Sequence, residues 1–164
     1  MTRPSSPSLA PTSDASEALR QFRVIFGAVR QHYQDVEKAC GISGAQIWAM
    51  AALRDAPGMK VSELAHALSI HASTASNLLD KVEKAGFIRR ERNSVDQRVV
   101  RLYLTPEGDR ALQSAPRPLT GILTDALARL PADTLARLNT DLAALIERME
   151  SVDTRAAETP LSGL

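Results

Sequence analysis

The sequence predicts a mainly α-helical fold with one small β-hairpin, and three observations support this class. Apolar residues between positions 61 and 84 suit two short helices around a tight turn, and a run rich in β-branched residues and arginine follows between 87 and 104. Long apolar stripes, at spacings of three and four, lie on both sides of this region. We therefore predict a winged helix-turn-helix head flanked by long helices that form a dimerisation region.

Length and composition are those of a soluble globular protein with one main core, because 44% of the 164 residues are hydrophobic and 24% are charged. Polar sequences at both ends, rich in Pro, Ser and Thr at the start, predict unstructured termini. The predicted divisions are a flexible arm at 1–13, a single domain at 14–150 with dimerisation helices at 14–40 and 106–150 around a head at 43–105, and a frayed tail at 151–164.

Composition also excludes several classes of function. A single cysteine rules out an internal disulfide, and the Cys and His residues lack the spacing of a metal site. The sequence has neither a signal-peptide pattern nor an apolar run that could span a bilayer, so we expect a cytoplasmic protein. It also lacks a phosphate-binding glycine loop and a nucleophile elbow, and we predict neither an enzyme nor a cofactor. Residues 61–105 carry seven Lys or Arg against five Asp or Glu, and this modest positive charge favours a nucleic-acid partner.

Three helices are predicted before the turn of the helix-turn-helix. The first should start at Asp14, with Glu17 completing its cap, and end at Gly41. Its apolar stripe consists of Leu19, Phe22, Phe26, Val29, Tyr33 and Val36. The second should begin with Ser43 and Gln46 as a capping box and stop at an Ala-Pro-Gly sequence. A later helix, capped by Ser62, should open the helix-turn-helix itself.

The second helix of the helix-turn-helix carries the candidate base-contacting residues. If its apolar side faces the core, a step of about 100° per residue puts polar and basic side chains on the opposite side. These are Ser73, Thr74, Asn77, Lys81 and Lys84. Asn can bond adenine bidentately in a major groove, and lysines can reach phosphates. An exposed Asn in mid-helix is commonly just solvated. Because Asn77 lies in a predicted helix-turn-helix, we favour a contact with a base. His71, near the start of this helix, should cap it or contact a phosphate.

The predicted hairpin is the wing. Val100, Leu102 and Leu104 fall on one face at a spacing of two, which leaves Arg101 and Tyr103 on the other. Alternate positions of the first strand also face opposite sides, so the wing arginines cannot all contact phosphate at once. Arg90 and Arg92 share a face and are the candidates we retain.

The part of the chain after the wing should be helical and interrupted. Thr105-Pro106-Glu107 opens a helix, and Pro116 and Pro118 should break it between Ala115 and Pro118. Two more apolar stripes follow, on either side of Pro131: Leu119, Ile122, Leu123, Ala126, Leu127 and Leu130, then Leu135, Leu138, Leu142, Leu145, Ile146 and Met149. Such stripes need a partner surface, which either a second copy of the chain or a monomeric bundle can supply.

Several short motifs occur together in the head: Leu64-Ala65, Ser73-Thr74-x-Ser76, Asp96-Gln97-Arg98, and Leu102-x-Leu104-Thr105-x-x-Gly108. With these motifs the chain resembles the MarR family of bacterial transcription regulators. The resemblance implies that the terminal helices interlock in a two-fold dimer and that residues 59–61 add a short strand to the wing. It implies that Arg98 enters a minor groove, oriented by Asp96, which agrees with the attraction of arginine to narrow minor grooves. It further implies an effector pocket near Phe26, Tyr33 and Trp48, for which core packing is the alternative.

We therefore predict a dimeric, sequence-specific DNA-binding transcription regulator, a repressor released by a small-molecule effector, acting on a palindromic operator in double-stranded DNA. The residues expected at DNA are Ser73, Thr74, Ser76, Asn77, Lys81, Lys84, Arg90, Arg92, Asp96 and Arg98. One alternative is a winged-helix module that binds protein without DNA, although such an interface would favour exposed aromatics. Another is a redox-responsive regulator acting through Cys40, although the negative end of the helix dipole there disfavours the thiolate that a sensor needs.

Overall fold

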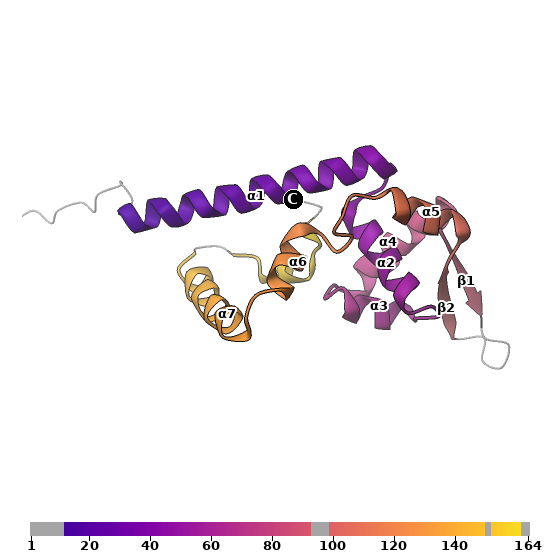
Figure 1. Ribbon diagram of the computed structural model, residues 1–164. Helices are drawn as coiled ribbons and strands as arrows, with labels where there is room; N and C mark the ends of the chain where they lie inside the picture. The colour runs from indigo at the N-terminus through magenta and orange to yellow at the C-terminus, as the bar shows by residue number, and fades with distance from the viewer. Residues whose placement is uncertain (1–11, 93–98, 150–151, 162–164) are drawn as a thin grey trace, which may run out of the picture.

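The computed structural model describes residues 12–92, 99–149 and 152–161, and in these ranges the chain is mainly α-helical with a two-stranded sheet (Figure 1). A long helix, α1 (Ser13–Cys40), lies along one side of the molecule, with the head at its C-terminal end. The head contains α2 (Gly44–Asp55), α3 (Val61–Ala67), α4 (Ala72–Lys84), β1 (Ile88–Arg92), β2 (Val100–Leu104) and α5 (Pro106–Ser114). None of the helices in the described ranges is long and apolar enough to cross a membrane.

The two ends of α1 differ in how well they were predicted. Thr12, and not Asp14, caps the start: its backbone is extended and its side chain accepts a hydrogen bond from the N–H of Ala15 at 3.3 Å. Asp14 then lies inside the first turn, where its charge still favours the positive end of the helix. At the other end, Gly41 adopts a φ of 68° and its N–H donates to the carbonyl of Glu37 at 2.8 Å, so the predicted end is confirmed.

The core of the head is built around α2. Its predicted capping box is present: the N–H of Ser43 donates to Gln46 Oε1 at 2.7 Å, and the N–H of Gln46 donates to Ser43 Oγ at 3.4 Å. Ile47, Met50 and Leu53 of α2 are fully buried. Helices α3, α4 and α5 and strand β2 all pack against α2, so this helix fixes the position of the helix-turn-helix relative to α1.

Helix α3 begins earlier than predicted, and Ser62 lies within it instead of capping it. Lys60 is the N-cap residue, and its backbone N–H donates to the side-chain carboxylate of Glu63, three residues later, at 2.8 Å. The early start leaves little extended chain for the strand expected at 59–61. What remains is one bridge between Met59 and Leu102: the N–H of Leu102 donates to the carbonyl of Met59 at 3.0 Å, and the N–H of Gly58 donates to the carbonyl of Leu102 at 2.9 Å.

The wing has the predicted alternation. Its strands pair antiparallel, with Ile88 opposite Leu104, Arg90 opposite Leu102 and Arg92 opposite Val100. Ile88 and Leu102 are buried against the head, so this is the inner face. Thr105 then caps α5, as predicted, by accepting a hydrogen bond from the N–H of Gly108 at 3.1 Å.

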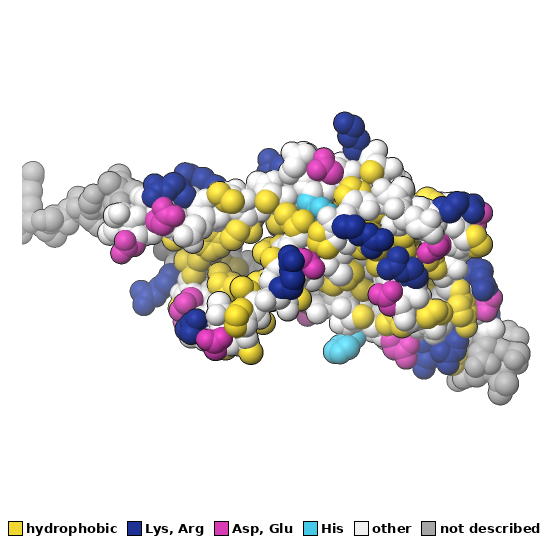
Figure 2. Space-filling model, in the orientation of Figure 1, with side chains coloured by type: hydrophobic (Ala, Val, Ile, Leu, Met, Phe, Trp, Pro, Cys, Tyr) yellow, Lys and Arg dark blue, Asp and Glu magenta, His cyan; other side chains and the backbone are white. Residues whose placement is uncertain are grey.

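The predicted break after α5 is also present. Helix α6 (Ile122–Ala128) packs against α1, and α7 (Ala132–Glu147) follows it without burying any residue. Figure 2 shows hydrophobic side chains gathered between α1 and the part of the chain formed by α6 and α7. Residues 152–161, here called the C-terminal tail, were expected to fray. They instead include a 3₁₀ helix, η1 (Thr154–Glu158), and return to the head.

The ring of Tyr33 connects α1, the head and the segment before α6. A Cβ atom added to Gly44, the first residue of α2, would lie 2.2 Å from Cδ1 of Tyr33. A Cβ atom added to Gly121, which has a φ of 90°, would lie 3.2 Å from the Tyr33 hydroxyl. Burial raises the pKa of this hydroxyl above its ordinary value. Gly44 is therefore required by the close approach of the Tyr33 ring, and Gly121 by its left-handed backbone, with the Tyr33 hydroxyl beside it.

Candidate nucleic-acid interface

Helix α4 has one buried face and one exposed polar face, as the sequence predicted. Ala75, Leu79 and Val82 are completely buried and fix the rotation of the helix about its axis. The exposed residues are Ser73, Asn77, Lys81 and Lys84, and Thr74 and Ser76 lie half-buried at the edges. The exposed face therefore places amide, hydroxyl and ammonium groups together on the outside of the head.

The N-terminus of α4 is occupied by His71. This residue is in the N-cap position, but its side chain makes no capping hydrogen bond. Its Nδ1 lies 2.7 Å from the Glu158 carboxylate of the C-terminal tail. An anion therefore already sits at the positive end of the helix, where a phosphate would also be attracted.

Arg90 has partners within the protein that the sequence analysis missed. Its guanidinium donates to Asp80 Oδ1 at 2.7 Å and to Glu83 Oε2 at 2.9 Å, both on α4. The arginine side chain is 28% exposed and the two carboxylates are 49% and 37% exposed. The sequence pattern that could have predicted this pairing is an arginine on the inner face of β1 together with Asp80 and Glu83, three residues apart near the end of the preceding helix. The two interactions hold β1 against α4, the second helix of the helix-turn-helix, here called the recognition helix.

The other described wing arginines have different surroundings. Arg89 pairs with Glu91 and lies over the ring of Tyr103, 4.8 Å from its centroid. Arg101 donates to the carbonyl oxygen of Gly58 at 2.8 Å and connects β2 to the loop after α2. Arg92, at the end of β1, is exposed. Two further predicted residues, Asp96 and Arg98, fall in 93–98, outside the described residues.

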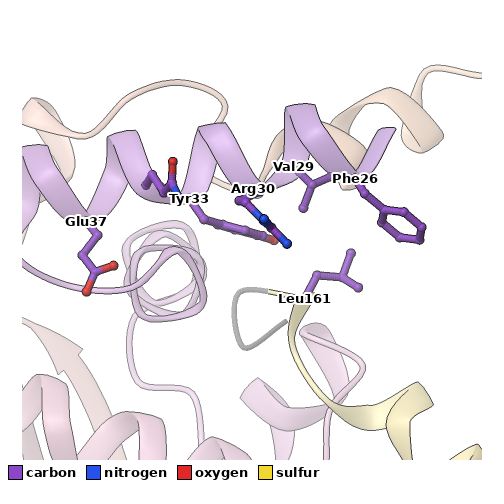
Figure 3. A pocket seen from close by; sticks show the side chains of 7 residues that line it. Phe26, Val29, Arg30, Tyr33, Glu37 and Leu161 are labelled. Atoms are coloured by element: carbon purple, nitrogen blue, oxygen red, sulfur yellow. The ribbon is translucent and has the colours of Figure 1, made fainter. Parts of the chain in front are cut away.

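The residues predicted for an effector pocket line two neighbouring hollows. Phe26 and Tyr33 line a hollow of about 580 Å³ on α1, and Figure 3 shows both pointing from the helix toward Leu161 of the C-terminal tail. Trp48 lines a separate hollow of about 160 Å³ between α2 and the tail, with Tyr33 again in its wall. Tyr33 therefore joins the predicted residues, and the sequence analysis missed Arg30 and Leu161.

Cys40, the residue of the redox alternative, is half-buried at the end of α1, with its Sγ 3.8 Å from the carbonyl oxygen of Ala111. Across the described ranges, three or more His, Cys, Asp or Glu side chains nowhere come close enough together to hold a metal ion.

Comparison with known proteins shows which family the head resembles. The MarR family model matches residues 42–100, which span the head from the start of α2 to the wing. The uncharacterised HTH-type transcriptional regulator YsmB of Bacillus subtilis is 25% identical over 140 residues, covering 85% of this chain and 96% of YsmB. The HTH-type transcriptional repressor MdtR of the same organism is 29% identical over 94 residues, covering 57% of this chain and 61% of MdtR.

Solved structures show the same fold. The S. aureus MepR–DNA complex aligns with a TM-score of 0.57 at 20% identity, over 80% of this chain and 97% of MepR. The predicted winged helix-turn-helix fold is thus confirmed. On the family match over residues 42–100 and on these relatives, the chain is a transcriptional regulator with a head of the MarR type, not an enzyme.

Proposed function

We propose that this regulator is a homodimer that binds a palindromic DNA operator through α4 and the wing, and that it represses transcription until a small molecule releases it. The observation that carries the proposal is the exposed face of α4, held outward by the buried residues Ala75, Leu79 and Val82. Hydroxyl and amide groups near the start of a recognition helix suit base edges, and lysines further along suit phosphates.

The proposed roles differ among the residues of the interface. Asn77, with Ser73, Thr74 and Ser76 around it, contacts bases. Lys81, Lys84 and Arg92 contact phosphates, because their side chains are exposed on α4 and at the end of β1. By the family resemblance, Arg98 enters the minor groove and Asp96 orients it. We revise the role of Arg90 from phosphate contact to positioning residue, because two carboxylates of α4 already hold its guanidinium.

The DNA-binding role can be tested by selecting bound fragments from random duplexes and measuring the affinity of the selected sequence by fluorescence anisotropy. Affinity should fall steeply between about 50 and 200 mM salt, since each phosphate contact releases counterions. Asn77→Ala should relax preference at one base pair by about 1–3 kcal/mol. Lys84→Ala should weaken binding to every sequence alike and reduce the salt slope by about 1.

The matched control is Lys38→Ala, which removes the same charge from an exposed position on α1. It should leave affinity and sequence preference unchanged. Affinity that does not depend on salt, or a selection that recovers no preferred sequence, would remove the proposal.

The homodimer is supported by apolar residues that the single chain leaves exposed. On α1 these include Val24 at 71% exposure and Phe26 at 57%, and on α7 they include Ile146 at 49%. Large exposed apolar patches of this kind mark association surfaces. Two-fold pairing through these helices would present two copies of α4 to half-sites about one helical turn apart.

Light scattering with size-exclusion chromatography tests the dimer. Ile146→Glu places a charge in the apolar stripe of α7 and should convert the dimer into a monomer. Ala144→Glu places the same charge on the opposite side of that helix and should not. A parent protein that is monomeric at every concentration would exclude this part of the proposal.

The release by an effector is supported by the hollow of about 580 Å³ beside Tyr33, a volume within the range of small-molecule sites. Its lining combines the ring of Phe26 with the charged groups of Arg30 and Glu37 (Figure 3). Screening a small-molecule library for compounds that reduce DNA affinity, followed by Phe26→Ala, tests this role. Compounds that act equally on the parent and on Phe26→Ala do not act through this hollow.

A further inference from the structure

The C-terminal tail lies on the head close to the proposed DNA-contacting residues. The Glu158 carboxylate is 2.7 Å from His71 Nδ1, at the N-terminus of α4. This helix has 13 residues, so its N-terminus has the partial positive charge of an aligned set of peptide dipoles. Glu158 therefore places a negative charge where a phosphate of bound DNA is expected to approach.

The residues after Glu158 continue along the side of the recognition helix. Thr159 and Pro160 line one hollow together with Thr74, Asn77 and Lys81. These three residues are among those proposed to face DNA. The tail then reaches α1, where Leu161 lies opposite Phe26 and Tyr33 (Figure 3). The segment thus has a polar attachment at α4 and an apolar attachment at α1.

Both attachments are weak enough to open. The side chains of Glu158 and His71 are 50% and 57% exposed, and a polar contact with such exposure changes an equilibrium by no more than about five-fold. Leu161 is 37% exposed, so only part of its apolar surface is removed from water. A duplex that forms several phosphate contacts can displace such a segment.

From these contacts we infer that the C-terminal tail is an internal competitor of DNA: in its closed position it covers one side of α4, and it must leave before DNA binds fully. The inference rests on the proposed DNA-binding role of α4 and adds regulation of that same surface. Any change that detaches the tail tightens DNA binding, and any change that fastens it weakens binding.

The position of the tail can be measured without DNA. Trp48, the only tryptophan of the sequence, lines a hollow whose walls include Ala157, Thr159, Pro160 and Leu161. In the full-length chain, Glu158→Gln combined with Leu161→Ser should detach the tail and make Trp48 more accessible to acrylamide. Glu17→Gln is the matched control, because it breaks an exposed ion pair with Arg20 in the first turns of α1, at the end far from the head (Figure 1). Equal quenching of all three proteins would show that the tail does not lie on the head.

The competition itself is measured by the affinity for the selected duplex. The double variant should bind about two- to five-fold tighter than the parent, and Glu17→Gln should bind like the parent. Leu161→Ser alone changes no charge and should also bind tighter, which separates uncovering of α4 from loss of a negative charge. In the parent, saturation with DNA should raise the acrylamide quenching of Trp48 to that of the double variant.

The outcomes separate this inference from the proposed function. If the parent selects no DNA, the proposed function fails, while the quenching comparison still reports where the tail lies. If the parent binds DNA and the double variant exposes Trp48 but binds equally or more weakly, the tail is not a competitor and the inference is overturned.

Discussion

Replacing Arg90 with glutamine tests whether this residue positions the wing or contacts DNA. The substitution removes hydrogen bonds of 2.7 and 2.9 Å to Asp80 and Glu83 and leaves two carboxylates without their shared cation. Exposed ion pairs contribute about 0–1 kcal/mol, and breaking a buried pair costs about 3–5 kcal/mol. The Arg90 side chain is 28% exposed, which places this interaction between the exposed and the buried case. We therefore expect Arg90→Gln to lower the free energy of unfolding by about 1–2 kcal/mol.

The matched control is Arg92→Gln, two residues along the same strand and on the same face. Because Arg92 is exposed, its loss should change the unfolding free energy by less than about 0.5 kcal/mol. Urea unfolding at one protein concentration, followed by circular dichroism, measures both values. A double-mutant cycle between Arg90→Gln and Glu83→Gln should show a coupling free energy, since the two side chains share an interaction.

The positioning role also predicts how DNA binding changes. Arg90→Gln should weaken binding through the displaced wing, and Asp80→Ala should weaken it as well, although it removes a negative charge from the recognition helix. If Arg90→Gln is as stable as Arg92→Gln and its only effect is a salt slope reduced by about 0.9, Arg90 is a phosphate contact and our reasoning is refuted.

Three further predictions concern the fold. Gly108→Ala should destabilise the chain by about 1–3 kcal/mol in urea unfolding, since its Cβ would lie 2.2 Å from the carbonyl oxygen of Phe87, whereas Gly27→Ala, with nothing within 4 Å, should be neutral or stabilising. Ser43→Ala should cost about 0.5–2 kcal/mol through loss of the N-cap, and an unchanged unfolding midpoint would contradict the role of the capping box. The pKa of Tyr33 should lie above its ordinary value of 10.0, because the ring is partly buried. Subtracting the ultraviolet titration of Tyr33→Phe from that of the parent isolates the ionisation of this one tyrosine. Since the folded chain keeps this proton longer than the unfolded chain, stability should fall as pH rises through the pKa of Tyr33 in the parent more than in Tyr33→Phe.

Periodicity and turn chemistry predicted most of the fold. The alternation of Val100, Leu102 and Leu104, the Ser43–Gln46 capping box and the proline-induced break before α6 are local patterns, and local geometry is enough to determine them. Helix starts were less certain because several residues near each start could act as the cap. Thr12 and Asp14 both have suitable side chains, and the backbone conformation decides between them.

Contacts between distant parts of the chain could not be predicted in the same way. The exposed face of α4 follows from its helical period, but the pairing of Arg90 with Asp80 and Glu83 depends on how β1 crosses the end of α4. The C-terminal tail was expected to fray because it is polar. Its contact with His71 joins residues that are remote in the sequence, and composition holds no information about such a pairing.

The position of Tyr33 has a consequence for how movement passes between the parts of the molecule. Its ring lies against Gly44 of the head and against Gly121 before α6, with no Cβ atom at either contact. Turning the head about α1 would drive a backbone segment into this ring, so the head and the C-terminal half of α1 should move as one rigid body. Changes in the distance between two recognition helices of a dimer would then arise by tilting of whole α1–head units, with bending concentrated in the segment that joins α5 to α6.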